Sequence, residues 1–245
     1  MTVPGDPRSS PGPRHPGRSA PFPRRLLEQP TLDAARALLG ARLVRDAVPA
    51  TDGSPGLARR VGRIVEVEAY IGEDDRASHA RFGPTDRNRV MYGPPGTAYV
   101  YLVYGMHHCL NVVTEPAGRP AALLVRAVEP IDGIESMCIA RQVLASGHPR
   151  ARTPDGVRPR SIPDARLAAG PGLVAAAFGI TRADTGADLC APASALRLET
   201  PPAAEPEAEI IAGPRVGIGY AAEPWMSVAW RFTVAGSPSI SGRAR

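Results

Sequence analysis

The sequence contains no lysine, because all 29 of its basic residues are arginine. A Schiff base on a lysine amine, the lysine of a phosphate-binding P-loop and a covalent link to pyridoxal phosphate are therefore excluded. Arginine keeps its charge and binds phosphate through two parallel hydrogen bonds. With a formal net charge of +5, these residues favour a nucleic-acid partner but do not establish one.

Cysteine is also scarce, and its three positions, Cys109, Cys138 and Cys190, lie far apart. An odd number of widely spaced cysteines is atypical of a disulfide framework or a zinc cluster, so we expect no metal. The longest apolar runs, 121–125 and 173–178, are much shorter than the about 20 residues that a membrane span requires. The start of the chain does not resemble a signal peptide, and we expect a cytoplasmic protein.

Composition divides the chain into a tail and one domain. Residues 1–23 are rich in proline, glycine, serine and arginine, and we predict that they are disordered. Hydrophobic periodicity predicts a capped amphipathic helix over 31–40 and a strand over 63–70. Residues 145–165 contain prolines and arginines without periodicity, which predicts a loop. We therefore expect a single α+β domain over residues 24–245.

Two further strand-like segments, 99–104 and 108–114, are separated by a glycine. This pattern predicts a β-hairpin whose tip lies at residues 104–106. Alternation along the first strand places Tyr101 and Tyr104 on opposite faces of the hairpin.

Aromatic residues make up only 5% of the chain, yet five of the six tyrosines and Phe82 fall within 35 residues. Glu68 and His79 lie beside or within this segment, and Asn111 and Arg126 follow it. Tyrosines also pack in ordinary strands, which is the alternative explanation. The polar residues in their company favour a pocket instead.

Glu66 and Glu68 lie in an apolar strand, where alternation groups them with Ile64 and Tyr70 on one face. A carboxylate beside a tyrosine could activate water as a general base, or both glutamates could lie on a solvated face. Their side-by-side placement does not suit the paired carboxylates of a sugar-cleaving enzyme, which flank the scissile bond. His79 is either a helix-end histidine bonded to the backbone or a ring that lines a pocket.

Long motifs occur in a fixed order along most of the chain. They are RIVEVEAYIG at 63–72, ASH at 77–79, MYGPPG at 91–96, YVYLVYGM at 99–106, LVRAVEP at 124–130 and PRVGIG at 214–219. Together they closely resemble the alkyladenine (3-methyladenine) DNA glycosylase family, the mammalian-type class also found in bacteria. The resemblance extends from about residue 24 to residue 241 and does not include the tail.

The resemblance implies a single mixed domain with a curved antiparallel sheet, a protruding β-hairpin and surrounding helices. It implies double-stranded DNA that contains damaged purines as the partner. We expect a monomer without a cofactor, located in the cytoplasm at the nucleoid. The implied reaction is hydrolysis of the N-glycosidic bond of an alkylated or deaminated purine after base flipping, in base excision repair. Because no lysine amine is present, we expect a monofunctional enzyme without lyase activity.

The resemblance also assigns catalytic roles to single positions. Glu68, and not Glu66, matches the glutamate that activates water. Arg126 matches the arginine that helps to hold this water, and the backbone carbonyl of Val216 matches its third anchor.

Other positions match residues that contact the base or the DNA. Tyr104 matches the side chain inserted into the minor groove, where it fills the space that the flipped base leaves. Met106 lies beside it, and Arg87 matches a phosphate contact. The matching residues of the base pocket are Tyr70, His79, Tyr101 and Asn111.

The chain departs from the family pattern at two positions. Leu173 stands where the family usually has a lysine, and Asp86 stands where it usually has a proline. We expect both changes to affect the affinity for DNA more than the chemical step. Two other functions stay open: a catalytically inactive nucleic-acid-binding module of the same fold, and a glycosidase that acts on free nucleosides. The intact catalytic positions disfavour the first, and the hairpin and the basic charge disfavour the second.

Overall fold

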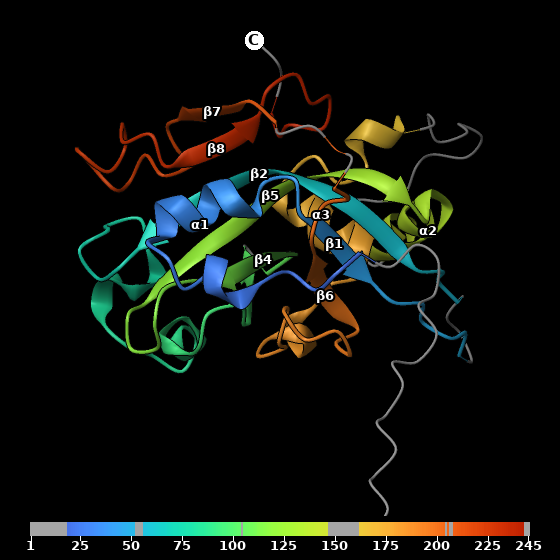
Figure 1. Cartoon of the computed structure of the whole chain (residues 1–245), viewed down its shortest axis with the longest axis horizontal. Coiled ribbons are helices and arrows are strands. Elements are labelled where there is room, and N and C mark those ends of the chain that lie inside the picture. The colour runs from blue at the N-terminus through green and yellow to red at the C-terminus, as the bar shows by residue number, and fades with distance from the viewer. Residues whose placement is uncertain are drawn as a thin grey trace, which may run out of the picture.

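The computed structural model describes residues 19–51, 56–103, 105–146, 162–203, 205 and 208–242. Within these ranges the chain forms one antiparallel sheet, three α-helices and five short 3-10 helices (Figure 1). The strands are β1 (Arg42–Arg45), β2 (Arg60–Ile71), β3 (Ala98–Val103), β4 (His107–Val113), β5 (Ala121–Asp132), β6 (Leu196–Glu199), β7 (Ile210–Gly213) and β8 (Arg231–Val234). The helices are α1 (Thr31–Leu38), α2 (Ile134–Ser146), α3 (Pro171–Phe178), η1 (Arg24–Leu26), η2 (His79–Phe82), η3 (Arg89–Tyr92), η4 (Asp164–Arg166) and η5 (Arg182–Asp184).

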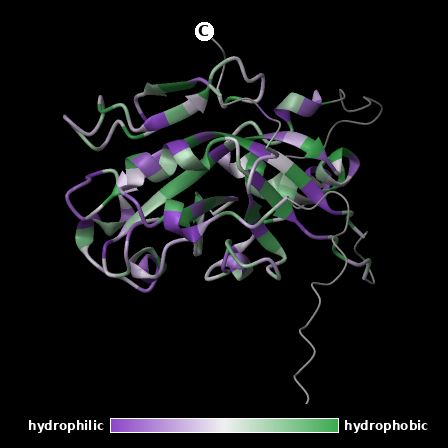
Figure 2. Cartoon of the chain, in the orientation of Figure 1, coloured by the Kyte–Doolittle hydropathy of each residue, from purple (hydrophilic) through white to green (hydrophobic). Residues whose placement is uncertain are grey.

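The sheet is curled, with the strand order β3-β4-β5-β2-β1-β6. One edge of β2 pairs with β5, and its other edge pairs first with β1 and then, over Glu66–Glu68, with β8. Figure 1 shows β7 and β8 above β2, to which β8 is paired, and Figure 2 shows hydrophobic residues concentrated along the central strands. The expected α+β fold with a curved antiparallel sheet is confirmed.

The predicted hairpin is also present. Strands β3 and β4 pair along their whole length, and the backbone N–H of Met106 donates to the carbonyl of Val103 at 3.0 Å. Gly105 in this turn has a φ of 69°, a conformation that favours glycine. Tyr104, the predicted wedge, lies outside the described residues.

Phe22, on the tail side of the predicted boundary at residue 24, packs with the domain. Phe22 is only 2% exposed and belongs to the main hydrophobic core, and its backbone N–H donates to the carbonyl of Leu198 at 3.0 Å. One phenylalanine among prolines gave no periodic signal, so composition alone grouped it with the tail. Residues 1–18, and 147–161 of the predicted loop, lie outside the described part of the chain.

Strict alternation fails in the middle of β2. The pairing with β5 shifts by one residue on each side of the Glu66–Ala127 pair, and Arg126 falls at the second shift. As a result Ile64 packs in the main core, not on the face of Glu66 as alternation predicted, and Val65 packs with Ala127 in a separate cluster. Such bulges redirect side chains, often beside active sites. This one places Arg126 near both glutamates of β2.

Candidate active site

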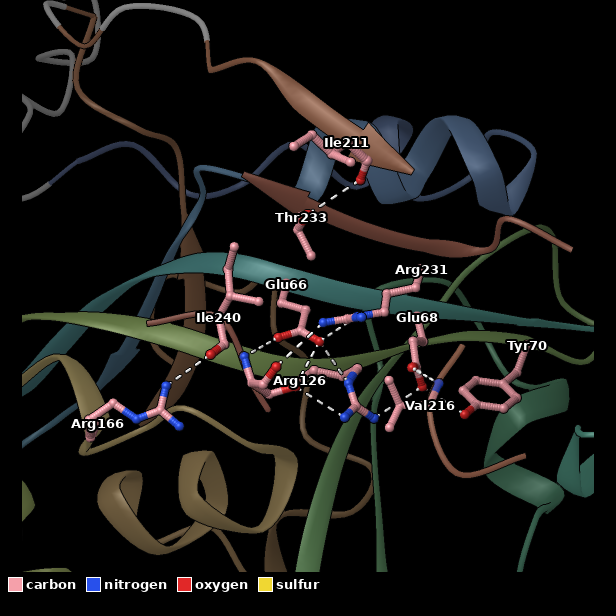
Figure 3. Close-up of polar contacts among 11 residues, drawn as sticks. Glu66, Glu68, Tyr70, Arg126, Arg166, Ile211, Val216, Arg231, Thr233 and Ile240 are labelled. Atoms are coloured by element: carbon pink, nitrogen blue, oxygen red, sulfur yellow. Dashed lines mark hydrogen bonds and ion pairs between the residues drawn. The ribbon is translucent and has the colours of Figure 1, made fainter. Parts of the chain in front are cut away.

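Glu68 lies in the middle of β2 with its side chain fully buried (Figure 3). Its Oε1 accepts a hydrogen bond from the backbone N–H of Val216 at 2.6 Å. Its Oε2 accepts from the hydroxyl of Tyr70 at 2.9 Å and from Nη1 of Arg126 at 3.2 Å. A carboxylate has about four acceptor positions, so these described donors leave one for a water molecule. Burial also shows that the solvated-face alternative is wrong.

Glu66 has a different environment, although it is equally buried. Its Oε1 accepts from Nε of Arg126 at 2.9 Å, from Nε of Arg231 at 2.8 Å and from the hydroxyl of Ser241 at 2.8 Å. Its Oε2 accepts from the backbone N–H of Ser241 at 2.6 Å. Three of these four bonds converge on Oε1, and two of the three come from arginines. Glu66 therefore anchors two arginines, whereas Glu68 retains capacity for chemistry.

Arg126 connects the two carboxylates. Its Nε and Nη1 bond to Glu66 and Glu68, and its Nη2 donates to the hydroxyl of Ser241 at 3.1 Å. Burial alone would lower the pKa of Arg126, but the charges of Glu68 and Glu66 outweigh it and raise the pKa. A full positive charge thus stays beside the candidate base. Val216 reaches Glu68 through its N–H, and the predicted role of its carbonyl stays a prediction.

A small cavity of about 50 Å³ lies next to Tyr70. Tyr99 lies two residues before Tyr101 on the same strand, so both side chains point to the same face. Alternation could therefore have identified Tyr99 as a lining residue. Tyr220 comes from a distant loop that gave no local signal. The lining residues are the four predicted ones, Tyr70, His79, Tyr101 and Asn111, together with Ala77, Met91, Tyr99, Ala122 and Tyr220.

His79 forms one wall of this cavity. Its Nδ1 lies 2.9 Å from the hydroxyl of Tyr99, and its ring meets that of Tyr101 edge to face, with centroids 4.4 Å apart. Burial lowers the pKa of His79 to about 4, and the nearby charges of Arg87 and Arg81 act in the same direction. The imidazole is therefore neutral at physiological pH and does not repel a cationic base.

We expect acid to destabilise the fold through His79. Its pKa falls from 6.5 in the unfolded chain to about 4 in the folded one, so between these values only the unfolded state takes up the proton. Stability that is complete above pH 6.5 is therefore lost as the pH falls to 4, by up to about 3 kcal/mol. Urea unfolding of the wild type and His79→Gln at pH 7, 5.5 and 4.5 should show their stability difference shrinking with acidity. A difference independent of pH would contradict this.

The ring of Tyr70 packs against the guanidinium of Arg215. The guanidinium carbon of Arg215 lies 4.8 Å from the centre of this ring and 5.0 Å from that of Trp230. Arg215 also forms a fully buried, bidentate ion pair with Asp75, at 2.6 and 2.9 Å. Burial, followed by the charge of Glu68, raises the pKa of Tyr70, so its hydroxyl remains a donor. Sequence reasoning assigned neither Asp75 nor Arg215 a role in the site.

Two of the predicted DNA contacts, Arg87 and Met106, are described by the structure, and both are exposed. Arg87 lies over the ring of Tyr101, with 5.5 Å between its guanidinium carbon and the ring centre. Met106, in the hairpin turn, is 48% exposed. Asp86 pairs with Arg89 at 2.6 Å. The acidic residue that departs from the family pattern is thus paired with Arg89, while Arg87 lies against Tyr101.

Comparison with known proteins identifies the family of this chain. A family model described as "Methylpurine-DNA glycosylase (MPG)" matches residues 25–238. Three relatives share the name "Putative 3-methyladenine DNA glycosylase". The protein of Methanocella arvoryzae is 46% identical and aligns over 91% of this chain and 96% of its own length. Those of Myxococcus xanthus and Bacillus cereus (strain G9842) are 43% and 41% identical, over 90% and 89% of this chain and 93% and 98% of their own. The chain therefore belongs to the methylpurine-DNA glycosylase family.

Proposed function

We propose that this protein hydrolyses the N-glycosidic bond between deoxyribose and damaged purines, above all methylated ones, in double-stranded DNA. The observation that carries the proposal is a buried carboxylate, Glu68, with one acceptor position left, linked through Tyr70 to an aromatic cavity. Family membership and the names of the relatives agree with it. We further infer that it acts as a monomer in the cytoplasm, as part of base excision repair.

The reaction needs a single general base. Glu68 takes one proton from a water molecule, and the water oxygen forms a bond to C1′ of the deoxyribose. The bond from C1′ to the purine nitrogen breaks, and its electron pair leaves with the base. A methylated purine that carries a positive charge in DNA leaves as a neutral base, so no paired acid is required. Arg126 and the N–H of Val216 hold the carboxylate in place.

A base inside a duplex cannot reach Glu68, so it must be flipped out at a cost of a few kcal/mol. We assign the wedge that fills the vacated space to Tyr104, with Met106 beside it and Arg87 on a phosphate. Inside the cavity, aromatic rings attract a cationic purine by about 0.5–2 kcal/mol each. Deaminated purines are neutral and lack this attraction, so we expect them to be poorer substrates.

Asn111 is expected to select among purines. Its amide nitrogen donates to the carbonyls of Tyr99 at 3.0 Å and Cys109 at 3.4 Å, so it offers its side-chain oxygen, an acceptor, to the base. We therefore expect Asn111→Ala to reduce the preference for amino-bearing methylpurines over hypoxanthine about tenfold, the value of one hydrogen bond. Single-turnover rates on the two substrates measure this ratio, and an unchanged ratio would argue against the assignment.

Methylated duplex DNA and the matching methylated nucleosides together test the proposed function. We expect free methylpurine, measured by mass spectrometry, to appear from the duplex and not at a comparable rate from the nucleosides. The DNA strand should stay intact until alkali is added, because no lysine is available for a lyase step. Equal rates would favour a nucleoside hydrolase, and strand cleavage without alkali would refute the monofunctional assignment.

A further inference from the structure

The last described part of the chain inserts beside the two glutamates of β2. Nη1 of Arg166 donates to the carbonyl of Ile240 at 3.0 Å (Figure 3). The residues on either side, Ser239 and Ser241, are buried, at 0% and 8% exposure. Both lie beyond residue 238, where the match to the family model ends. The segment is thus packed against the domain, and Ser241 is its residue that reaches the site.

Ser241 makes three of the contacts that hold this site together. Its backbone N–H donates to Oε2 of Glu66 at 2.6 Å, and its hydroxyl donates to Oε1 of Glu66 at 2.8 Å. The same hydroxyl accepts from Nη2 of Arg126 at 3.1 Å. Its single proton goes to Glu66, which leaves a lone pair for Arg126. The hydroxyl therefore fits between a carboxylate and a guanidinium in one orientation only.

These contacts fix the plane of Arg126. A guanidinium is rigid and planar, so Nε bound to Glu66 and Nη2 bound to Ser241 together determine where Nη1 points. Nη1 is the atom that contacts Glu68. We propose that Ser241 is a positioning residue for the base-release reaction, acting on Glu68 through Arg126. The inference rests on the proposed function.

Loss of the hydroxyl would leave Nη2 of Arg126 without its acceptor in a buried site. The other acceptors that contact Arg126 are the carboxylates of Glu66 and Glu68. Glu66 already binds Arg231 through Oε1 at 2.8 Å. Arginine readily pairs with a carboxylate through two nitrogens. Nη2 would therefore turn toward Glu68 and occupy the acceptor position that the water needs.

The test uses the full chain and three variants on methylated duplex DNA. We expect Ser241→Ala to slow single-turnover base release about tenfold with unchanged DNA affinity, as for the loss of one charge-assisted hydrogen bond. Ser241→Thr keeps the hydroxyl and should keep most of the rate. Ser239→Ala is the matched control, because the hydroxyl of Ser239 is buried without a partner among the described residues. It should release base at the wild-type rate.

A double-variant cycle separates positioning from general stability. If Ser241 acts through Arg126, Ser241→Ala has no further effect in an Arg126→Gln background. Three results would overturn the inference. They are a second tenfold loss in the Arg126→Gln background, a rate for Ser241→Ala equal to that of Ser239→Ala, and a loss in Ser241→Thr equal to that in Ser241→Ala.

A readout that does not depend on activity distinguishes failure of this inference from failure of the proposed function. The Nε–H signal of Arg126 in a nitrogen-15 spectrum should shift or broaden in Ser241→Ala. An unchanged signal overturns the inference even when the wild type releases base. If the wild type releases none, the proposed function fails, while a shifted signal still supports the positioning of Arg126 by Ser241.

Discussion

Glu68→Gln is expected to slow base release about 100- to 10,000-fold, the contribution of a general base. Glutamine has nearly the same shape but cannot take a proton from water at neutral pH. Its amide group would also set an N–H against one of the donors that Glu68 now accepts from, Val216, Tyr70 or Arg126. Single-turnover measurements with enzyme in excess isolate this step from product release.

DNA binding should not change in this variant, since the contacts of Glu68 are internal and its side chain is fully buried. Glu209→Gln is a suitable control, because the side chain of Glu209 is exposed, whereas that of Glu68 is buried. Base release by Glu68→Gln at the rate of Glu209→Gln would show that another group activates the water.

Asp75→Ala is expected to lower the free energy of unfolding by about 3–5 kcal/mol. The substitution leaves Arg215 with an uncompensated charge, since both side chains are 0% exposed. It also removes the acceptor for the backbone N–H groups of Ile71, at 3.2 Å, and Ala77, at 3.0 Å. Tyr70 loses its support through Arg215, so base release should fall as well. Chemical denaturation followed by fluorescence measures the stability.

Asp86→Ala provides the matched control for this experiment. Asp86 forms an ion pair at 2.6 Å with Arg89, but the two side chains are 95% and 76% exposed. Exposed pairs contribute about 0–1 kcal/mol. Equal destabilisation by Asp75→Ala and Asp86→Ala would mean that the buried pair is not a support of the site.

Local sequence patterns predicted most of the fold. Hydrophobic periodicity located α1, β2 and the β3–β4 hairpin, because each of these elements buries one regular face. Periodicity did not predict the bulge at Glu66, since a bulge is the place where strict alternation fails. Nor did composition identify the buried Phe22, whose partner strand β6 lies far along the chain.

The same distinction explains what could be predicted of the site. Tyr70, His79, Tyr101 and Asn111 fall in one short part of the sequence, so clustering and motifs identified them together. The supporting contacts join residues that are far apart. Arg215 and Asp75 are 140 positions apart in the sequence, and Ser241 and Glu66 are 175 positions apart. Only the folded chain brings such residues into contact, so no local pattern indicates them.

The most direct test of the central claim measures bound DNA and free base in one sample of wild-type protein and methylated duplex. Our account predicts that free 3-methyladenine accumulates until the substrate is consumed, leaving alkali-labile strands. Tight binding of the duplex without release of any purine would contradict it. That result would instead identify the protein as an inactive nucleic-acid-binding module that retains the family's fold.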